Sequence, residues 1–116
     1  MLFRSRHTNT IVIADRGFPF WPQIETVDIS LVDDVPTVLQ VLNALRGSCV
    51  FGKAWIAKEF LRANDKRTHA SFVAALKGAT VKFEPHVDFK KRIPNAIGLI
   101  RTGDTTPYGN IVLESA

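Results

Sequence analysis

Short apolar runs alternate along the chain with segments in which apolar residues recur at helical spacing. The runs are rich in β-branched side chains and are bounded by glycine, proline and acidic residues, which predicts short, largely buried strands. The predicted strands lie at 10–14, 24–31, 79–83, 96–100 and 111–113. Residues 54–61 fit a strand and a helix equally well.

Helices are predicted between these strands from their start and stop signals. Asp33 and Asp34 precede Val35-Pro36, a good helix start, and apolar residues then recur at helical spacing as far as Leu45. Asn64 or Asp65 can cap a second helix, and a short third helix begins near His86. The alternation predicts a single domain over residues 1–116, an α/β three-layer sandwich with a largely parallel central sheet flanked by helices.

Composition limits the class of protein. The chain has 116 residues, of which 46% are hydrophobic, as expected for one globular domain. No apolar run approaches the ~20 residues of a membrane span, so we expect no membrane partner. The first ten residues lack the apolar stretch of a secretory signal, and Cys49 has no second cysteine to pair with. A reducing cytoplasm is therefore the expected location.

The positive charge of the chain does not form one patch. The net charge is +4 and the isoelectric point about 9.6, but the cations are scattered over many segments, so we expect no nucleic-acid partner. Neither a dinucleotide fingerprint, a phosphate loop nor a serine-hydrolase elbow occurs. The three histidines lack close metal-ligand spacing, so we also expect no metal.

Residues 96–113 contain the most informative chemistry. Two apolar runs flank a turn-rich polar linker, 102–107, and then Tyr108-Gly109-Asn110. A phenol and an amide lie side by side there, and Gly109 would let the backbone approach a ligand closely. Such groups suit a polyhydroxylated small molecule better than an ion or a phosphate.

Three further residues are candidates, each with a plainer interpretation. Asp15 follows the first strand, at the edge where open α/β sheets bind ligands, and could equally cap loop amides. His86 follows a strand at the same edge, or is simply a polar residue at a helix start. His7 precedes the first strand and could transfer a proton near neutral pH, or be an exposed histidine near the chain end.

Taken together, these residues resemble the D-ribose pyranase and L-fucose mutarotase family over almost the whole chain. The resemblance depends on the order of six motifs: His7-Thr8-x-Thr10, Asp15-x-Gly17-Phe18-Pro19, Asp28-Ile29-x-Leu31, Val35-Pro36-x-x-x-Gln40-Val41-Leu42, His86-x-x-Phe89-Lys90 and Ile100-Arg101-Thr102-Gly103-Asp104-x-x-Pro107-Tyr108-x-Asn110-Ile111.

The resemblance implies an isomerase that interconverts ring or anomeric forms of a free monosaccharide, such as D-ribose, without a cofactor. It places the catalytic histidine at His7 and sugar contacts at Asp15, His86 and Tyr108-Gly109-Asn110. His86 favours the ribose branch, because the fucose branch carries arginine there, whereas Gly109 matches the fucose branch. The family forms rings of subunits, so the resemblance also implies a homo-oligomer with sites near subunit contacts.

Some positions depart from the family pattern. Arg6 and Arg16 are bulky cations beside His7 and Asp15, and Asp34 stands where glycine is common. Six residues precede His7, so we expect the family's N-terminal helix to be missing. These departures leave two alternatives open: an L-fucose-type mutarotase, and a protein of the same fold that binds a monosaccharide without catalysis.

Overall fold

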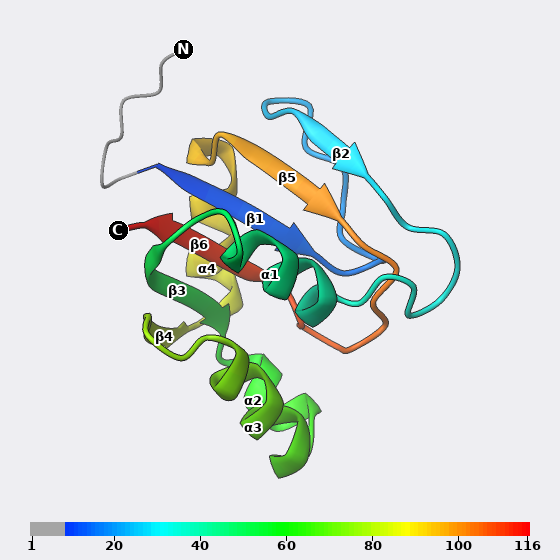
Figure 1. The fold of residues 1–116 in the computed structure, drawn as a ribbon. Helices are drawn as coiled ribbons and strands as arrows, with labels where there is room; N and C mark the ends of the chain where they lie inside the picture. The colour runs from blue at the N-terminus through cyan, green and yellow to red at the C-terminus, as the bar shows by residue number, and fades with distance from the viewer. Residues whose placement is uncertain (1–8) are drawn as a thin grey trace.

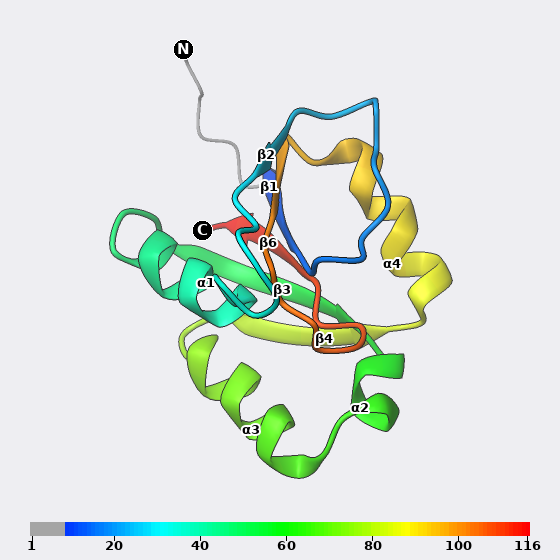
Figure 2. The same ribbon diagram turned by 90° about the vertical axis from the view of Figure 1, so that its right-hand side faces the viewer.

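The computed structural model describes residues 9–116, which form a six-stranded sheet with helices on both faces (Figures 1 and 2). The strands are β1 (Thr10–Ala14), β2 (Thr26–Asp28), β3 (Phe51–Ala57), β4 (Thr80–Glu84), β5 (Gly98–Arg101) and β6 (Ile111–Ser115). The helices are α1 (Val38–Arg46), α2 (Glu59–Ala63), α3 (Lys66–Ala75) and α4 (His86–Arg92), followed by a 3₁₀ turn, Ile93–Asn95.

The strand order is β2-β5-β1-β6-β3-β4. Strand β5 is parallel to β1 and β2, and β3 is parallel to β4, whereas β6 runs antiparallel to both β1 and β3. The predicted sandwich with a largely parallel sheet is therefore confirmed. Because β6 alone among the described strands is reversed, it begins at the edge where the other five end.

Both faces of the central strands are buried, which explains why they read as continuous apolar runs. Ile13, Ile56 and Ile111 point into a core with α1 and α3, whereas Val12, Trp55 and Val112 point into a second core with α4. Figure 2 shows α1 and α3 on one side of the sheet and α4 on the other. The sheet thus separates two apolar layers, and its edges are left for polar chemistry.

The predicted start of α1 at Val35 is wrong. The helix begins at Val38 with Thr37 as N-cap: the Thr37 hydroxyl accepts from the Gln40 amide at 3.1 Å, and the Gln40 side chain accepts from the Thr37 amide at 2.9 Å. This reciprocal pair is a capping box. The acidic residue before it, Asp34, lies in a turn with φ 64°, so it does not start the helix.

Two ambiguous segments are resolved by the structure. Residues 54–61 divide into the end of β3 and the start of α2. Asp65 caps α3 by accepting from the Thr68 amide at 2.9 Å. Hydrogen bonds from the amide and the side chain of Thr68 lower the pKa of the Asp65 carboxyl. Asn64 instead donates to the carbonyl of Pro107 at 2.9 Å, which ties α2 to the loop before β6. Between residues 9 and 116, no helix is long and apolar enough to cross a membrane.

Candidate functional site

The topology brings the described candidates to one edge of the sheet. Asp15 directly follows β1, and His86 follows β4 as the first residue of α4. Tyr108, Gly109 and Asn110 directly precede β6, which begins at that same edge because it is reversed. Figure 1 shows the ends of β1 and β5 and the start of β6 together. His7 and Arg6 lie outside the described residues.

Asp15 and Asn110 form the first half of the site. The Asp15 backbone amide donates to Oδ1 of Asn110 at 2.6 Å, although 95 residues separate them in sequence. The Asn110 side chain also hydrogen-bonds to the Asp15 carboxylate, and Asn110 itself is buried. One amide group therefore fixes both the backbone and the side chain at the end of β1.

The Asp15 carboxylate is more basic than an exposed one. Burial raises its pKa, and the nearby Asp104 carboxylate raises it further. Hydrogen bonds from Asn110 and from the amides of Gly17 and Phe18 act in the opposite direction. Asp15 thus does cap loop amides, as the plainer interpretation held, yet it remains half-exposed at the ligand edge.

His86 and Tyr108 form the second half. Their rings meet edge to face with centroids 5.2 Å apart, and the His86 ring also stacks on Phe89 at 6.1 Å. The His86 backbone amide donates to Oε1 of Glu59 at 3.0 Å. Three contacts therefore hold His86, although it remains half-exposed. Beside it is a hollow of about 450 Å³ lined by Lys58, Glu59, Leu61, Arg62 and Pro85.

The turn 106–110 joins the two halves. Tyr108 has φ 56°, a left-handed conformation that turns the chain before Gly109. The Gly109 amide donates to the Thr106 carbonyl at 3.0 Å, and a Cβ on Gly109 would lie 3.0 Å from that same oxygen. The missing side chain of Gly109 therefore makes room for its own loop, and the close approach of a ligand at this position stays a prediction.

The cation at Arg16 is compensated within the structure. Its guanidinium forms an ion pair with Asp33, and its carbonyl accepts a hydrogen bond from Arg101. Arg101 in turn pairs with Asp28 at 2.8 Å. The charge that departs from the family pattern is thus held by Asp33 and is not left unpaired beside Asp15.

Two buried polar residues of the site were missed by the sequence analysis. Thr102 and Asp104 lie in the segment that the sequence predicts to be a polar linker, yet both are buried. The Thr102 hydroxyl donates to the carbonyl of Ala14 at 2.8 Å, next to Asp15. The motif Thr102-Gly103-Asp104 was the available signal, but its polarity indicated an exposed turn.

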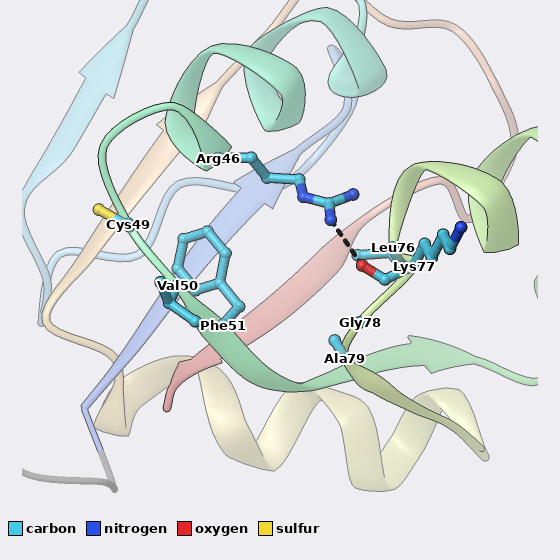
Figure 3. A pocket seen from close by; sticks show the side chains of 8 residues that line it. All are labelled: Arg46, Cys49, Val50, Phe51, Leu76, Lys77, Gly78 and Ala79. Carbon is cyan, nitrogen blue, oxygen red and sulfur yellow. Dashed lines mark hydrogen bonds between the residues drawn. The ribbon is translucent and has the colours of Figure 1, made fainter.

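Another hollow, of about 170 Å³, lies at the opposite edge, where β3 and β4 begin (Figure 3). Arg46 at the end of α1 crosses it and donates to the carbonyl of Lys77 at 2.5 Å, and also to that of Ala75. Its guanidinium therefore satisfies carbonyls at the end of α3. This hollow contains none of the candidate residues.

Within residues 9–116, no group of three or more histidine, cysteine or acidic side chains is placed to hold a metal ion.

Known proteins resemble this chain over nearly its whole length. The model of the RbsD / FucU transport protein family matches residues 1–116. The D-ribose pyranase of Geobacillus kaustophilus is 38% identical over 109 residues, covering 94% of this chain and 79% of that protein. The D-ribose pyranase of Thermoanaerobacter pseudethanolicus is 36% identical over 112 residues, covering 97% and 85%.

Solved structures agree with the fold. Bacillus subtilis RbsD, determined in complex with D-ribose, superimposes with a TM-score of 0.89 at 28% identity, over 97% of this chain and 85% of that one. The fucose mutarotase of Streptococcus pneumoniae, determined with L-fucose, gives a TM-score of 0.78 at 18% identity, over 97% and 85%. The second similarity supports the fold alone.

Proposed function

The chain belongs to the RbsD / FucU transport protein family, and we propose that it is a sugar isomerase that interconverts the pyranose and furanose forms of free D-ribose. The observation that carries the proposal is the gathering of two polar pairs, Asp15 with Asn110 and His86 with Tyr108, at one edge of the sheet. Relatives named D-ribose pyranase, at 36–38% identity over most of the chain, support the same activity.

The reaction makes modest demands on the protein. Opening a cyclic hemiacetal removes a proton from the anomeric hydroxyl and delivers one to the ring oxygen. These openings already occur in water, so one positioned acid–base group, contributing about 10²–10⁴-fold, is sufficient. Nothing is oxidised and no phosphoryl group moves, so the reaction requires no cofactor.

We assign the roles as follows. His7 is the general acid that protonates the ring oxygen, because the family's catalytic histidine falls on it. Asp15 accepts a hydrogen bond from a sugar hydroxyl, since its burial disfavours an unpartnered charge. His86 and Tyr108 supply the complementary base or further hydroxyl contacts, and Asn110 acts mainly by holding Asp15.

Ribose is favoured over fucose as the substrate. His86 matches the ribose branch, and the named pyranases are the more similar relatives. One observation favours an L-fucose-type mutarotase as the second candidate: Gly109 is the fucose-branch residue. In either case the substrate is a free monosaccharide and the reaction is an isomerisation.

The test is exchange measured by NMR saturation transfer on D-ribose, with L-fucose in parallel. The wild-type protein should accelerate pyranose–furanose exchange of ribose, and His7→Ala should lose roughly 10²–10⁴-fold of that acceleration. His69→Gln is the matched control, because His69 packs on Phe60 in the α2–α3 layer, and it should stay near wild type. Acceleration of fucose alone would establish the second candidate.

Absence of exchange with both sugars would reject isomerisation of ribose and of fucose, and would leave an isomerase of another sugar or a binding protein. Tight binding of a monosaccharide without exchange would then identify a sugar-binding protein of the same fold. Full activity of His7→Ala would instead reject the assignment of His7 as the acid.

We also propose that the protein is a cytoplasmic homo-oligomer. Exposed apolar side chains on β2 and the segment after it, including Val27, Leu31 and Val32, support a subunit contact. The lone Cys49, with an exposed thiol, fits a reducing compartment.

A further inference from the structure

Asp104 is a buried charged residue for which the proposed chemistry has no use. It is only 3% exposed and lies three residues beyond the end of β5, at the edge that carries the site. Burying a carboxylate is unfavourable unless its oxygens are hydrogen-bonded, so its partners indicate why it is there.

The partners of Asp104 come from three separate segments. Its Oδ2 accepts from the Val38 amide at 2.8 Å, and its Oδ1 accepts from the Thr106 amide at 2.7 Å. Its backbone carbonyl accepts from the Arg16 amide at 2.8 Å. Its own amide donates to the Thr102 hydroxyl, which donates in turn to the Ala14 carbonyl. The residues on both sides of Asp15 are thereby tied to Asp104.

Capping of α1 does not account for this arrangement. Thr37 and Gln40 already form a reciprocal cap for the helix. A carboxylate at the Val38 amide adds a favourable charge at the helix N-terminus, but that contact occupies a single oxygen. The second oxygen and the carbonyl serve the two loops that carry Asp15 and the turn 106–110.

We propose that Asp104 is a positioning residue that holds Asp15 and the turn 106–110 at a fixed separation, so that a monosaccharide fits between them. This rests on the proposed function, since it assumes that sugar contacts come from both. The proximity of the two carboxylates supports the proposal. Burial is the largest cause of the raised pKa of Asp15, and the Asp104 carboxylate is the second largest.

The substitution Asp104→Asn tests the proposal. The amide keeps the shape of the side chain but can accept only one of the two hydrogen bonds from Val38 and Thr106. With the loops misplaced, kcat/KM for D-ribose should fall roughly 10- to 100-fold, mainly through a raised KM. Asp34→Asn is the matched control, because Asp34 accepts from Thr105 of the same loop but has an exposed carboxylate. It should change kcat/KM less than about twofold.

Amide hydrogen exchange without sugar separates positioning from general stability. In Asp104→Asn the amides of Arg16 and Thr106 should lose protection, while the Thr68 amide, capped by Asp65 in α3, keeps it. Equal loss at all three amides would indicate a merely structural role. Wild-type kcat/KM in Asp104→Asn would also overturn the proposal.

A measurement on the wild type tests the proposal even if Asp104→Asn fails to fold. Adding D-ribose should raise protection at Arg16, Val38 and Thr106 together and leave Thr68 unchanged, whereas a response at one of the three alone would contradict a shared anchor. Failure of the proposed function is distinct, because the wild type would then accelerate no exchange while the loss of amide protection in Asp104→Asn would remain.

Discussion

At the residue scale, Asp15 combines its proposed role in sugar binding with an unfavourable effect on stability. Its carboxylate is partly withdrawn from water and lies near a second carboxylate, and both effects raise its pKa. A group whose pKa is higher in the folded state than in the unfolded chain lowers stability once the pH exceeds the unfolded value. A sugar hydroxyl would offset this penalty by donating a hydrogen bond to the charge.

The substitution Asp15→Asn should therefore raise the melting temperature at neutral pH while weakening sugar binding. The gain should shrink as the pH falls from the folded pKa toward 3.8, because the wild-type carboxyl then takes up its proton. Affinity should drop roughly 10- to 100-fold, since hydrogen bonds to charged groups contribute about 1.5–3 kcal/mol. Thermal melts across pH and ribose titration check the two parts.

A wild-type protein that gains stability over Asp15→Asn as the pH rises would contradict this explanation. It would mean that the hydrogen bonds from Asn110, Gly17 and Phe18 outweigh burial.

Most of the described candidate site could be predicted from single residues, but its support could not. Asp15 and His86 were placed correctly because each follows a strand, and strand ends fix position along the sheet edge. Asp104 and Thr102 were missed because a polar residue is recognised as buried only when its partners are known. Those partners, such as Val38 and Ala14, are 66 and 88 residues away in sequence.

At the scale of elements, an ion pair adds to the backbone pairing that joins the short edge strand β2 to β5. Arg101 at the end of β5 donates to Asp28 at 2.8 Å and also to the Arg16 carbonyl, so it joins β2 to the loop after β1. The Ser30 hydroxyl and amide, and then Arg101, lower the pKa of Asp28 to about 2.

This lowered pKa predicts how Asp28→Ala depends on pH. The stabilisation from the carboxylate should be fully present above its ordinary pKa of 3.8 and disappear as the pH falls toward about 2. Asp28→Ala should therefore melt below wild type at neutral pH, and the two curves should converge on acidification. A gap that stays constant down to the lowest pH at which both proteins fold would show that the charge of Asp28 is irrelevant.

The connection between β5 and β6 packs so closely that one position admits only glycine. A Cβ on Gly103 would lie 2.3 Å from the Val32 carbonyl oxygen and 2.7 Å from that of Val35. Gly103→Ala should lower the free energy of unfolding by about 2 kcal/mol or more, since backbone must move to admit the methyl group. Denaturant titration measures this change.

Gly17→Ala is the control for that substitution. The nearest heavy atom to a Cβ there is Asp15 Oδ1 at 4.0 Å, so its stability should change by less than about 0.5 kcal/mol. Equal effects at the two positions would show that close packing at Gly103 is not the cause.

The elements themselves were predictable wherever local chemistry decides them. The run at 10–14 became β1, and Asp65 caps α3 as one of the two expected residues. The start of α1 was misplaced because Asp33, Asp34 and Pro36 are start signals of the right type in the wrong position. The correct signal is Thr37 followed three residues later by Gln40, the pattern of a capping box.

At the scale of the whole molecule, the position of β6 brings the candidate site together. Placing the last strand between β1 and β3, antiparallel to both, brings the residues before it to the edge where parallel strands end. Apolar runs indicated that strands exist and that both faces are buried. They carry no information on strand order, because every central strand has the same pattern, so the pairing of Asp15 with Asn110 emerged only in three dimensions.

Exposed apolar side chains are also unevenly distributed over the surface of the molecule. Val27, Ile29, Leu31, Val32 and Val35, all exposed, occupy β2 and the segment before α1, beside the site edge. Edge strands with uncovered apolar side chains are prone to associate, so a stable protein needs them covered. A second copy of the chain is the occupant expected from the proposed homo-oligomer.

Substitution of Leu31 tests this association. In solution the mass should be a multiple of 12.9 kDa, and Leu31→Asp should lower it, because a buried contact would receive an unpaired charge. Val50→Asp is the matched control, since Val50 and Leu31 are each 77% exposed but Val50 lies at the opposite edge of the sheet. Light scattering coupled to size exclusion measures both. A wild-type mass of 12.9 kDa would refute the oligomer. Dissociation by Val50→Asp alone would show that the subunit contact lies at the other edge, away from the proposed sugar site.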